Sequence, residues 1–125
     1  MSHFVTIKTQ IKDIEALKSA CSELGLAVLQ NAKARGYGGS EVQADHVIRL
    51  KGPFDVALNQ QKDKTFALST DWWGGHVEKE IGKDYTKLMQ LYAVHKAIRE
   101  AKKKGHLVKR QNQQDGSIKL VIQGC

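Results

Sequence analysis

The chain has 125 residues, of which 41% are hydrophobic and 26% charged, and its formal net charge is +7. This length and composition indicate one globular domain, residues 1–125, and exclude a disordered or low-complexity chain. Two cysteines, Cys21 and Cys125, are too few for a disulfide scaffold, and no apolar run approaches the roughly 18 residues that span a bilayer, so we expect a cytoplasmic protein without membrane insertion.

The first 25 residues predict a strand followed by a helix. Residues 4–11 alternate between apolar and polar side chains, with Val5 and Ile7 on one face, which is the period of a half-buried strand. Asp13 stands where an N-cap belongs, apolar residues then follow at helical spacing, and Gly25 supplies a stop. We therefore expect a helix from Asp13 to about Gly25.

The next part of the chain predicts four strands. Residues 26–34 and 44–52 fit two strands on either side of the glycine-rich loop 35–40, and residues 54–61 and 64–73 fit a hairpin. The strongest helical pattern follows, because apolar residues recur at i, i+3 and i+4 steps from about Val77 to Lys104. Within it, Gly82 weakens the first turn, and the stable helix is expected from about Lys83.

The last predicted element is a hairpin over residues 106–123, since Asp115-Gly116 is a strong turn dipeptide. Ile118, Leu120 and Ile122 are expected to face inward. The element order is then β-α-β-β-β-β-α-β-β, with a mostly antiparallel sheet. Two amphipathic helices packed on one face of that sheet give a two-layer α+β sandwich.

Both tryptophans stand side by side at the end of a predicted strand, before Gly74 and Gly75. Trp72 continues the face of Phe66 and is expected in the core, whereas Trp73 lies on the opposite face, which a two-layer fold leaves open to solvent unless something covers it. An exposed tryptophan often marks an interface. The alternative is that the chain bends at the glycines and both rings pack under the long helix.

The glycine-rich loop and the histidines offer the other candidate sites. Residues 35–40 lack the Walker lysine and dinucleotide spacing, so they form either a surface loop or a ligand-gripping loop with Arg35 as an anion contact and Tyr37 as a stacking group. His76 and Glu80, with Asp71 nearby, allow a weak metal site if the helix begins early. A polar loop is the favoured interpretation, and we expect no metal, no cofactor and no catalytic residue.

The positive charge is concentrated in residues 99–110, where six basic residues and one glutamate give a net of +5. Several of these side chains are candidates for neutralising phosphates in a nucleic acid: Lys102, Lys103, Lys104, Lys109 and Arg110. The other interpretation is a solvated helix end, since lysines there complement the helix dipole.

Five short motifs occur in order along the chain: "MSHF", "ADHVIRL", "DWWGG", "LYA" and "DGSIKL". In their order and spacing the chain resembles the hypothetical chloroplast open reading frame thirty-five family of cyanobacteria, algal plastids and some other bacteria. The resemblance implies an accessory role linked to photosynthesis or redox metabolism, in the cytoplasm or plastid stroma, and it carries over no catalytic residues. The ending "VIQGC" departs from the family, so Cys125 is not treated as one of its features.

These observations together predict a small non-enzymatic accessory protein that binds a partner protein. The expected contacts are Arg35, Tyr37, Asp71, Trp73 and His76. The alternative is a nucleic-acid-binding module that uses residues 99–110, and an uncovered sheet face would equally serve a homo-oligomer. A third, weaker hypothesis is a small-ligand binder or enzyme built around "RGYGG" and "DWWGGH".

Overall fold

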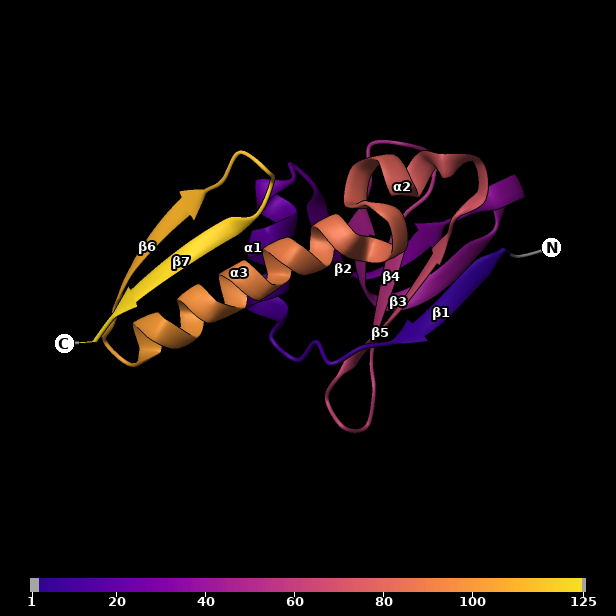
Figure 1. The fold of residues 1–125 in the computed structure, drawn as a ribbon. Helices are drawn as coiled ribbons and strands as arrows, with labels where there is room; N and C mark the ends of the chain where they lie inside the picture. The colour runs from indigo at the N-terminus through magenta and orange to yellow at the C-terminus, as the bar shows by residue number, and fades with distance from the viewer. Residues whose placement is uncertain (1–2, 125) are drawn as a thin grey trace.

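The computed structural model describes residues 3–124, which form an α+β fold with the predicted order of elements, except that the long helix is divided in two (Figure 1). The elements are β1 (Phe4–Lys8), α1 (Ile14–Glu23), β2 (Ala27–Arg35), β3 (Glu41–Arg49), β4 (Val56–Gln60), β5 (Phe66–Asp71), α2 (His76–Ile81), α3 (Thr86–Lys103), β6 (Leu107–Asn112) and β7 (Ile118–Gln123). None of the helices in this described part is long and apolar enough to cross a membrane.

Five of the strands form one antiparallel sheet in the order β1-β5-β4-β3-β2, and α1 and α3 cover one of its faces. The prediction of two helices on one face is therefore confirmed. Helix α1 begins as predicted, because Asp13 Oδ1 accepts a hydrogen bond from the backbone N–H of Ala16 at 3.0 Å. The main core joins Leu17 of α1 and Leu88 of α3 to the sheet residue Leu68, all fully buried.

The helices cover the centre of the sheet and leave its edge exposed. Strand β1 pairs only with β5, and its Val5 and Ile7 are 52% and 40% exposed. The prediction that they share one face is confirmed, because they pair opposite the buried Thr70 and Leu68, but they are more exposed than a half-buried strand predicts. The reason is that an edge strand has a neighbour on one side only, and no helix extends over it.

The second face of the sheet is partly covered by the sheet itself. Val28 of β2 packs in the main core, whereas Ala32 and Ala34, further along the same strand, pack on the opposite face against Val47 of β3. Between them Asn31 has a left-handed φ of 51°, which rotates the strand. The second face, expected to be open to solvent unless something covers it, is therefore covered in part, because the far half of the β2–β3 hairpin curls over it.

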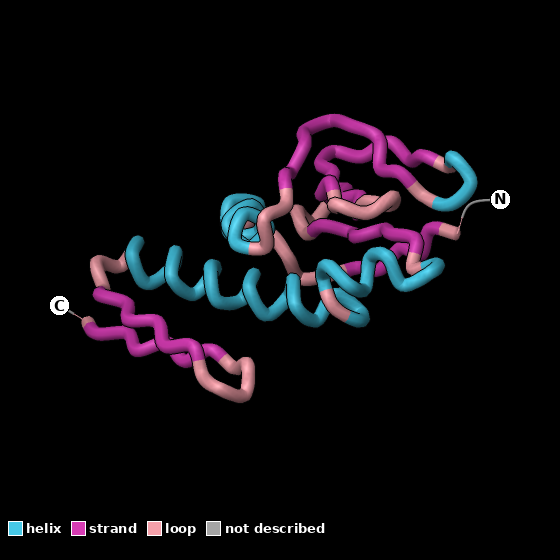
Figure 2. The backbone as a smooth tube through the Cα atoms, turned by 90° about the horizontal axis from the view of Figure 1, so that it is seen from above, coloured by secondary structure: helices cyan, strands magenta, loops and turns pink. Residues whose placement is uncertain are grey.

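The C-terminal hairpin forms a second, two-stranded sheet and does not extend the larger one. Seen from above in Figure 2, β6 and β7 extend along the C-terminal half of α3, beyond the larger sheet. Ile118 and Leu120 are half-buried as predicted, but Ile122 is 47% exposed. A hairpin that packs on a single helix has too little apolar surface beneath it to cover the whole strand.

Ion pairs attach this hairpin to the main body. The Arg110 guanidinium donates to both carboxylate oxygens of Glu23, at the end of α1, at 2.8 Å each. His95 of α3 also contacts Glu23, with its Nε2 at 2.8 Å from Oε1. The hydrogen bonds from Arg110, aided by those from His95, lower the pKa of the Glu23 carboxyl from 4.5 to about 2. One carboxylate therefore connects three elements.

We expect Glu23→Gln to reduce the free energy of unfolding at pH 7 by on the order of 1 kcal/mol, because a partly exposed bidentate pair is lost. Since folding lowers the pKa from 4.5 to about 2, the stabilisation is complete above about pH 4.5 and disappears as the pH falls toward 2. Urea unfolding of wild type and variant at pH 7, 4, 3 and 2 measures this difference.

The matched control is Glu15→Gln, which removes an exposed carboxylate of α1 that contacts only Lys18, at 3.7 Å. Its effect should stay within a few tenths of a kcal/mol at every pH, at the low end of surface ion pairs. A Glu23→Gln effect that does not change with pH would contradict the assignment of the lowered pKa to the Arg110 pair.

Candidate functional site

The two tryptophans separate because the strand before them ends early. Strand β5 stops at Asp71, Trp72 has a non-extended backbone, and Trp73–Gly75 form a single 3-10 turn in which Gly74 and Gly75 are left-handed. Trp72 lies half-buried against the core, with its ring edge-on to Tyr85 at 5.0 Å between centroids. Trp73 is 52% exposed. Its exposure agrees with the expectation, but its cause is the turn and not the opposite face of a strand.

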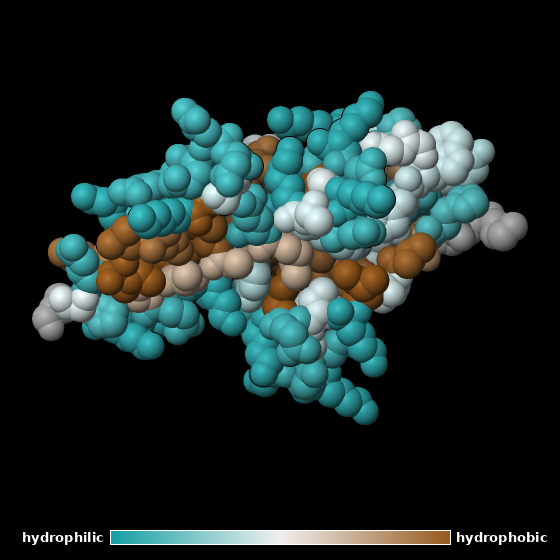
Figure 3. Space-filling view, viewed as in Figure 1, coloured by the Kyte–Doolittle hydropathy of each residue, from teal (hydrophilic) through white to brown (hydrophobic). Residues whose placement is uncertain are grey.

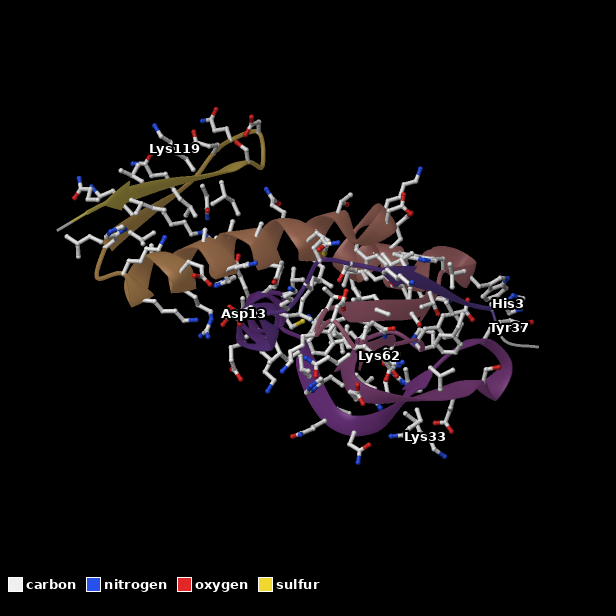
Figure 4. The ribbon with its side chains drawn as sticks, turned by 90° about the horizontal axis from the view of Figure 1, so that it is seen from below. His3, Asp13, Lys33, Tyr37, Lys62 and Lys119 are labelled. Atoms are coloured by element: carbon white, nitrogen blue, oxygen red, sulfur yellow. The ribbon has the colours of Figure 1, made fainter. Side chains whose placement is uncertain are left out.

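Trp73 belongs to a row of rings at one end of the molecule. Its centroid lies 4.7 Å from that of Tyr37, which is itself 41% exposed, and 6.2 Å from that of His76. His3 extends the row on the other side of Tyr37, at 5.1 Å, and Figure 4 shows these two labelled residues side by side. We call His3, Tyr37, Trp73 and His76 the aromatic cluster. The structure thus brings together three of the predicted contact residues.

A buried carboxylate fixes the two exposed rings relative to each other. Asp71 is fully buried, and its Oδ2 accepts a hydrogen bond from the Tyr37 N–H at 2.9 Å while its Oδ1 accepts one from the Trp73 N–H at 3.0 Å. The loop of Tyr37 also approaches β1 closely, since a Cβ on Gly36 would lie 2.5 Å from the Phe4 ring. Asp71 is therefore a positioning residue and not itself a surface contact.

Arg35, predicted as an anion contact, has a structural role instead. Its Nε and Nη2 donate to the two carboxylate oxygens of the fully buried Asp55 at 2.8 Å each, and its Nη2 also donates to the carbonyls of Leu50 and Gly52. These bonds with Asp55 hold the pKa of Arg35 above its ordinary value. The guanidinium is already paired, so we leave it out of the contact surface.

The weak metal interpretation gains no support from the geometry. Glu80 accepts hydrogen bonds from the backbone N–H groups of Lys51 and Gly52, at 2.7 and 3.0 Å, and does not combine with His76 and Asp71. No group of three or more His, Cys, Asp or Glu side chains within residues 3–124 is arranged to hold an ion. His76 instead lies between the rings of Trp73 and Phe54.

The basic residues lie at the other end of the molecule. Lys102, Lys103 and Lys104 are exposed at the end of α3, and Lys109 is exposed on β6. Arg110 is not free, since it pairs with Glu23. In Figure 4, Lys119 of the same hairpin lies at the end opposite His3 and Tyr37. The two candidate surfaces are thus separate.

Two neighbours of the site are not predicted from the sequence. His3 joins the aromatic cluster, and the Phe54 ring meets the His76 ring edge-on at 5.4 Å between centroids. Neither residue belongs to a periodic pattern that would place it there. A shallow hollow of about 360 Å³ lies beside the Tyr37 loop, between residues 35–41 and Pro53-Phe54. In the space-filling view, pale surface of intermediate hydropathy covers this end (Figure 3).

Comparison with known proteins gives a family and two relatives. A family model described as "Protein of unknown function (DUF1257)" matches residues 20–121. "Uncharacterized protein ycf35" of Pyropia yezoensis is 34% identical over 127 residues, covering 98% of this chain and 97% of the relative. The protein of the same name from Cyanophora paradoxa is 27% identical over 126 residues, with the same coverage. No solved structure matches the chain.

Proposed function

The chain belongs to the DUF1257 family, and from this starting point we propose that it is a non-enzymatic accessory protein that binds a partner protein through the aromatic cluster. We place it in the plastid stroma or the cytoplasm, in a role linked to photosynthesis or redox metabolism. The likeness to proteins named ycf35 supports the plastid or cyanobacterial type, and the geometry of the cluster supports partner binding.

The exposed Trp73 carries this proposal. A tryptophan with half of its surface in water, packed against a tyrosine that is itself 41% exposed, offers a large apolar area that a partner can bury. Its backbone is already fixed by Asp71, so binding need not order the loop first. Tryptophan and tyrosine are the residue types that most often dominate the energy of protein interfaces.

The remaining chemistry of the described chain supports a non-enzymatic role. Cys21 of α1 lies in the main core, and burial raises the pKa of its thiol to about 12, so it is protonated at neutral pH and is not a nucleophile. The alternative of nucleic-acid binding retains four exposed lysines but not Arg110, which pairs with Glu23. We therefore favour the partner protein.

We expect Trp73→Ala to abolish capture of the partner from native lysate and to leave stability nearly unchanged. The ring packs on the rings of Tyr37 and His76 and lies half in solvent, so its loss should change the free energy of unfolding by about 1 kcal/mol or less. Parallel affinity capture and urea unfolding of wild type and variant measure both quantities.

The matched control is Leu107→Ala, which truncates a 68% exposed apolar side chain on β6, at the other end of the molecule. Capture by this variant should equal that by wild type. The assignment of the interface to Trp73 is wrong if Trp73→Ala captures the same proteins as wild type, or if it lowers stability by several kcal/mol, as truncation of a core tryptophan does.

A further inference from the structure

The aromatic cluster lies over a buried negative charge that no cation of the described chain neutralises. Asp71 is fully buried and accepts two backbone hydrogen bonds, but it takes part in none of the ion pairs within residues 3–124. By contrast, the buried Asp55 pairs with both Arg35 and Arg49. The field of Asp71 is therefore free to act on whatever contacts the rings above it.

The surroundings of the rings carry the same sign. Residues 71–80 contain Asp71, Glu78 and Glu80 against Lys79, a net of −2, although the whole chain has a net charge of +7. Glu78 on α2 is exposed, and so is Glu41, which begins β3 directly after the Tyr37 loop. The segment that carries Trp73 and His76 is thus acidic in a basic protein.

The two exposed rings have the chemistry that attracts a cation. The faces of tryptophan and tyrosine are electron-rich, and a guanidinium or ammonium group over them is bound more strongly where carboxylates lie nearby. Arginine fits best, because its planar guanidinium stacks on aromatic faces and is more weakly hydrated than an ammonium group.

We propose that the aromatic cluster receives an arginine side chain of the partner protein, stacked against Trp73 and Tyr37 and drawn there by the Asp71 carboxylate, which binds the backbone of both residues. This inference rests on the proposed function and specifies its partner, which presents a cationic segment at the contact. An acidic or phosphorylated segment is disfavoured, because its charge would be repelled by the Asp71 carboxylate and by the net negative charge of residues 71–80.

The test uses two short peptides that differ only in charge. One is an acetylated and amidated pentapeptide of glycine with arginine at its centre, and the other has citrulline, the neutral isostere of arginine, in that place. Chemical shifts of the Trp73 indole N–H are followed during titration of the full chain with each peptide. We expect the arginine peptide to bind about tenfold more tightly, in the range of a desolvated cation–π contact.

Two variants and a salt series test whether the preference for the arginine peptide depends on Trp73 and on charge. It should disappear in Trp73→Leu, persist in Leu107→Ala at the far end of the molecule, and weaken when ionic strength is raised. Amide shifts serve as the readout in Trp73→Leu, since the indole is absent there.

Equal affinity for the two peptides, no saturable shift with either, or a preference that survives in Trp73→Leu each overturn the inference. The failure of the proposed function is a separate result, namely capture of the same partner proteins by Trp73→Ala and wild type. A partner that depends on Trp73 but binds without regard to charge would therefore sink the arginine assignment alone.

Discussion

Replacement of Asp55 by alanine is expected to lower the free energy of unfolding by about 3–5 kcal/mol, the usual effect of removing one partner of a buried ion pair. The carboxylate is fully buried and accepts hydrogen bonds from the Arg35 side chain and backbone N–H and from the N–H of Leu50, while Arg49 Nε lies 3.4 Å away. Its loss leaves two guanidinium groups without their anion and several donors without an acceptor.

Urea unfolding at pH 7 measures this effect, and Glu41→Ala is the matched control. Glu41 is also a carboxylate close to Arg35, because it begins β3 and pairs in register with Arg35 of β2, but its side chain is exposed. Its removal changes the net charge by the same amount and should alter stability by no more than about 0.5 kcal/mol. If the two variants lose similar stability, the effect comes from net charge and not from the buried pair.

The pair of Asp55 with Arg35 also affects the candidate site, because it holds the end of β2 in place just before the loop of Tyr37. The Asp55 N–H donates to the Arg35 carbonyl at 3.0 Å, and the Arg35 N–H donates back to Asp55 Oδ2 at 2.9 Å. This reciprocal contact fixes the end of β2 two residues before Tyr37. We therefore infer that two buried carboxylates, Asp55 and Asp71, together position the exposed ring of Tyr37.

The elements of this fold follow from local patterns in the sequence. Asp13 caps α1 because a side-chain oxygen at that position satisfies an N–H that has no partner in the helix. The turn around Asp115-Gly116 closes the last hairpin, and Asp115 Oδ1 accepts from the Ser117 N–H at 2.9 Å. Such interactions join residues close in the chain, so their spacing is visible without a structure.

The errors concern contacts between distant residues. Nothing in the alternation of β2 shows that the strand rotates at Asn31, so the curl over the second face is missed. The pairing of Arg35 with Asp55 joins residues 20 positions apart, and an arginine in a glycine-rich loop resembles an anion contact until that partner is known. The prediction that Trp73 is exposed extends the alternation of a strand as far as Trp73. Strand β5 ends at Asp71, two residues earlier, so that alternation does not apply.

The long helix was predicted as one piece, and its division at Gly82 yields the other large expected effect. Gly82 has φ 84° and ψ 160°, a conformation that only glycine adopts readily, and it is followed by left-handed Asp84 and Tyr85 before α3 begins at Thr86. The stable helix therefore starts three residues later than the expected Lys83. A strained connection of this kind persists only because the packing of Tyr85 in the core requires it.

We expect Gly82→Ala to lower the free energy of unfolding by about 3 kcal/mol or more, since backbone strain and overpacking each contribute about 1–3 kcal/mol. The new Cβ would lie 2.7 Å from the backbone nitrogen of Lys87 and 2.6 Å from Thr86 Oγ1, and the helix backbone cannot move away. The control is Gly38→Ala, where φ is also left-handed, at 66°, but no described atom beyond the glycine and its two chain neighbours lies within 4 Å of the added Cβ.

Gly38→Ala should cost about 1 kcal/mol, from backbone conformation alone. Urea unfolding of both variants therefore separates the steric part of the Gly82 effect from the conformational part. Equal losses of unfolding free energy in the two variants would mean that the connection between α2 and α3 tolerates a side chain at Gly82. The close approach of α3 would then not impose the backbone conformation of Gly82. A larger loss at Gly82 means instead that the break is fixed by packing, which keeps His76 at the start of α2 beside Trp73 and preserves the aromatic cluster.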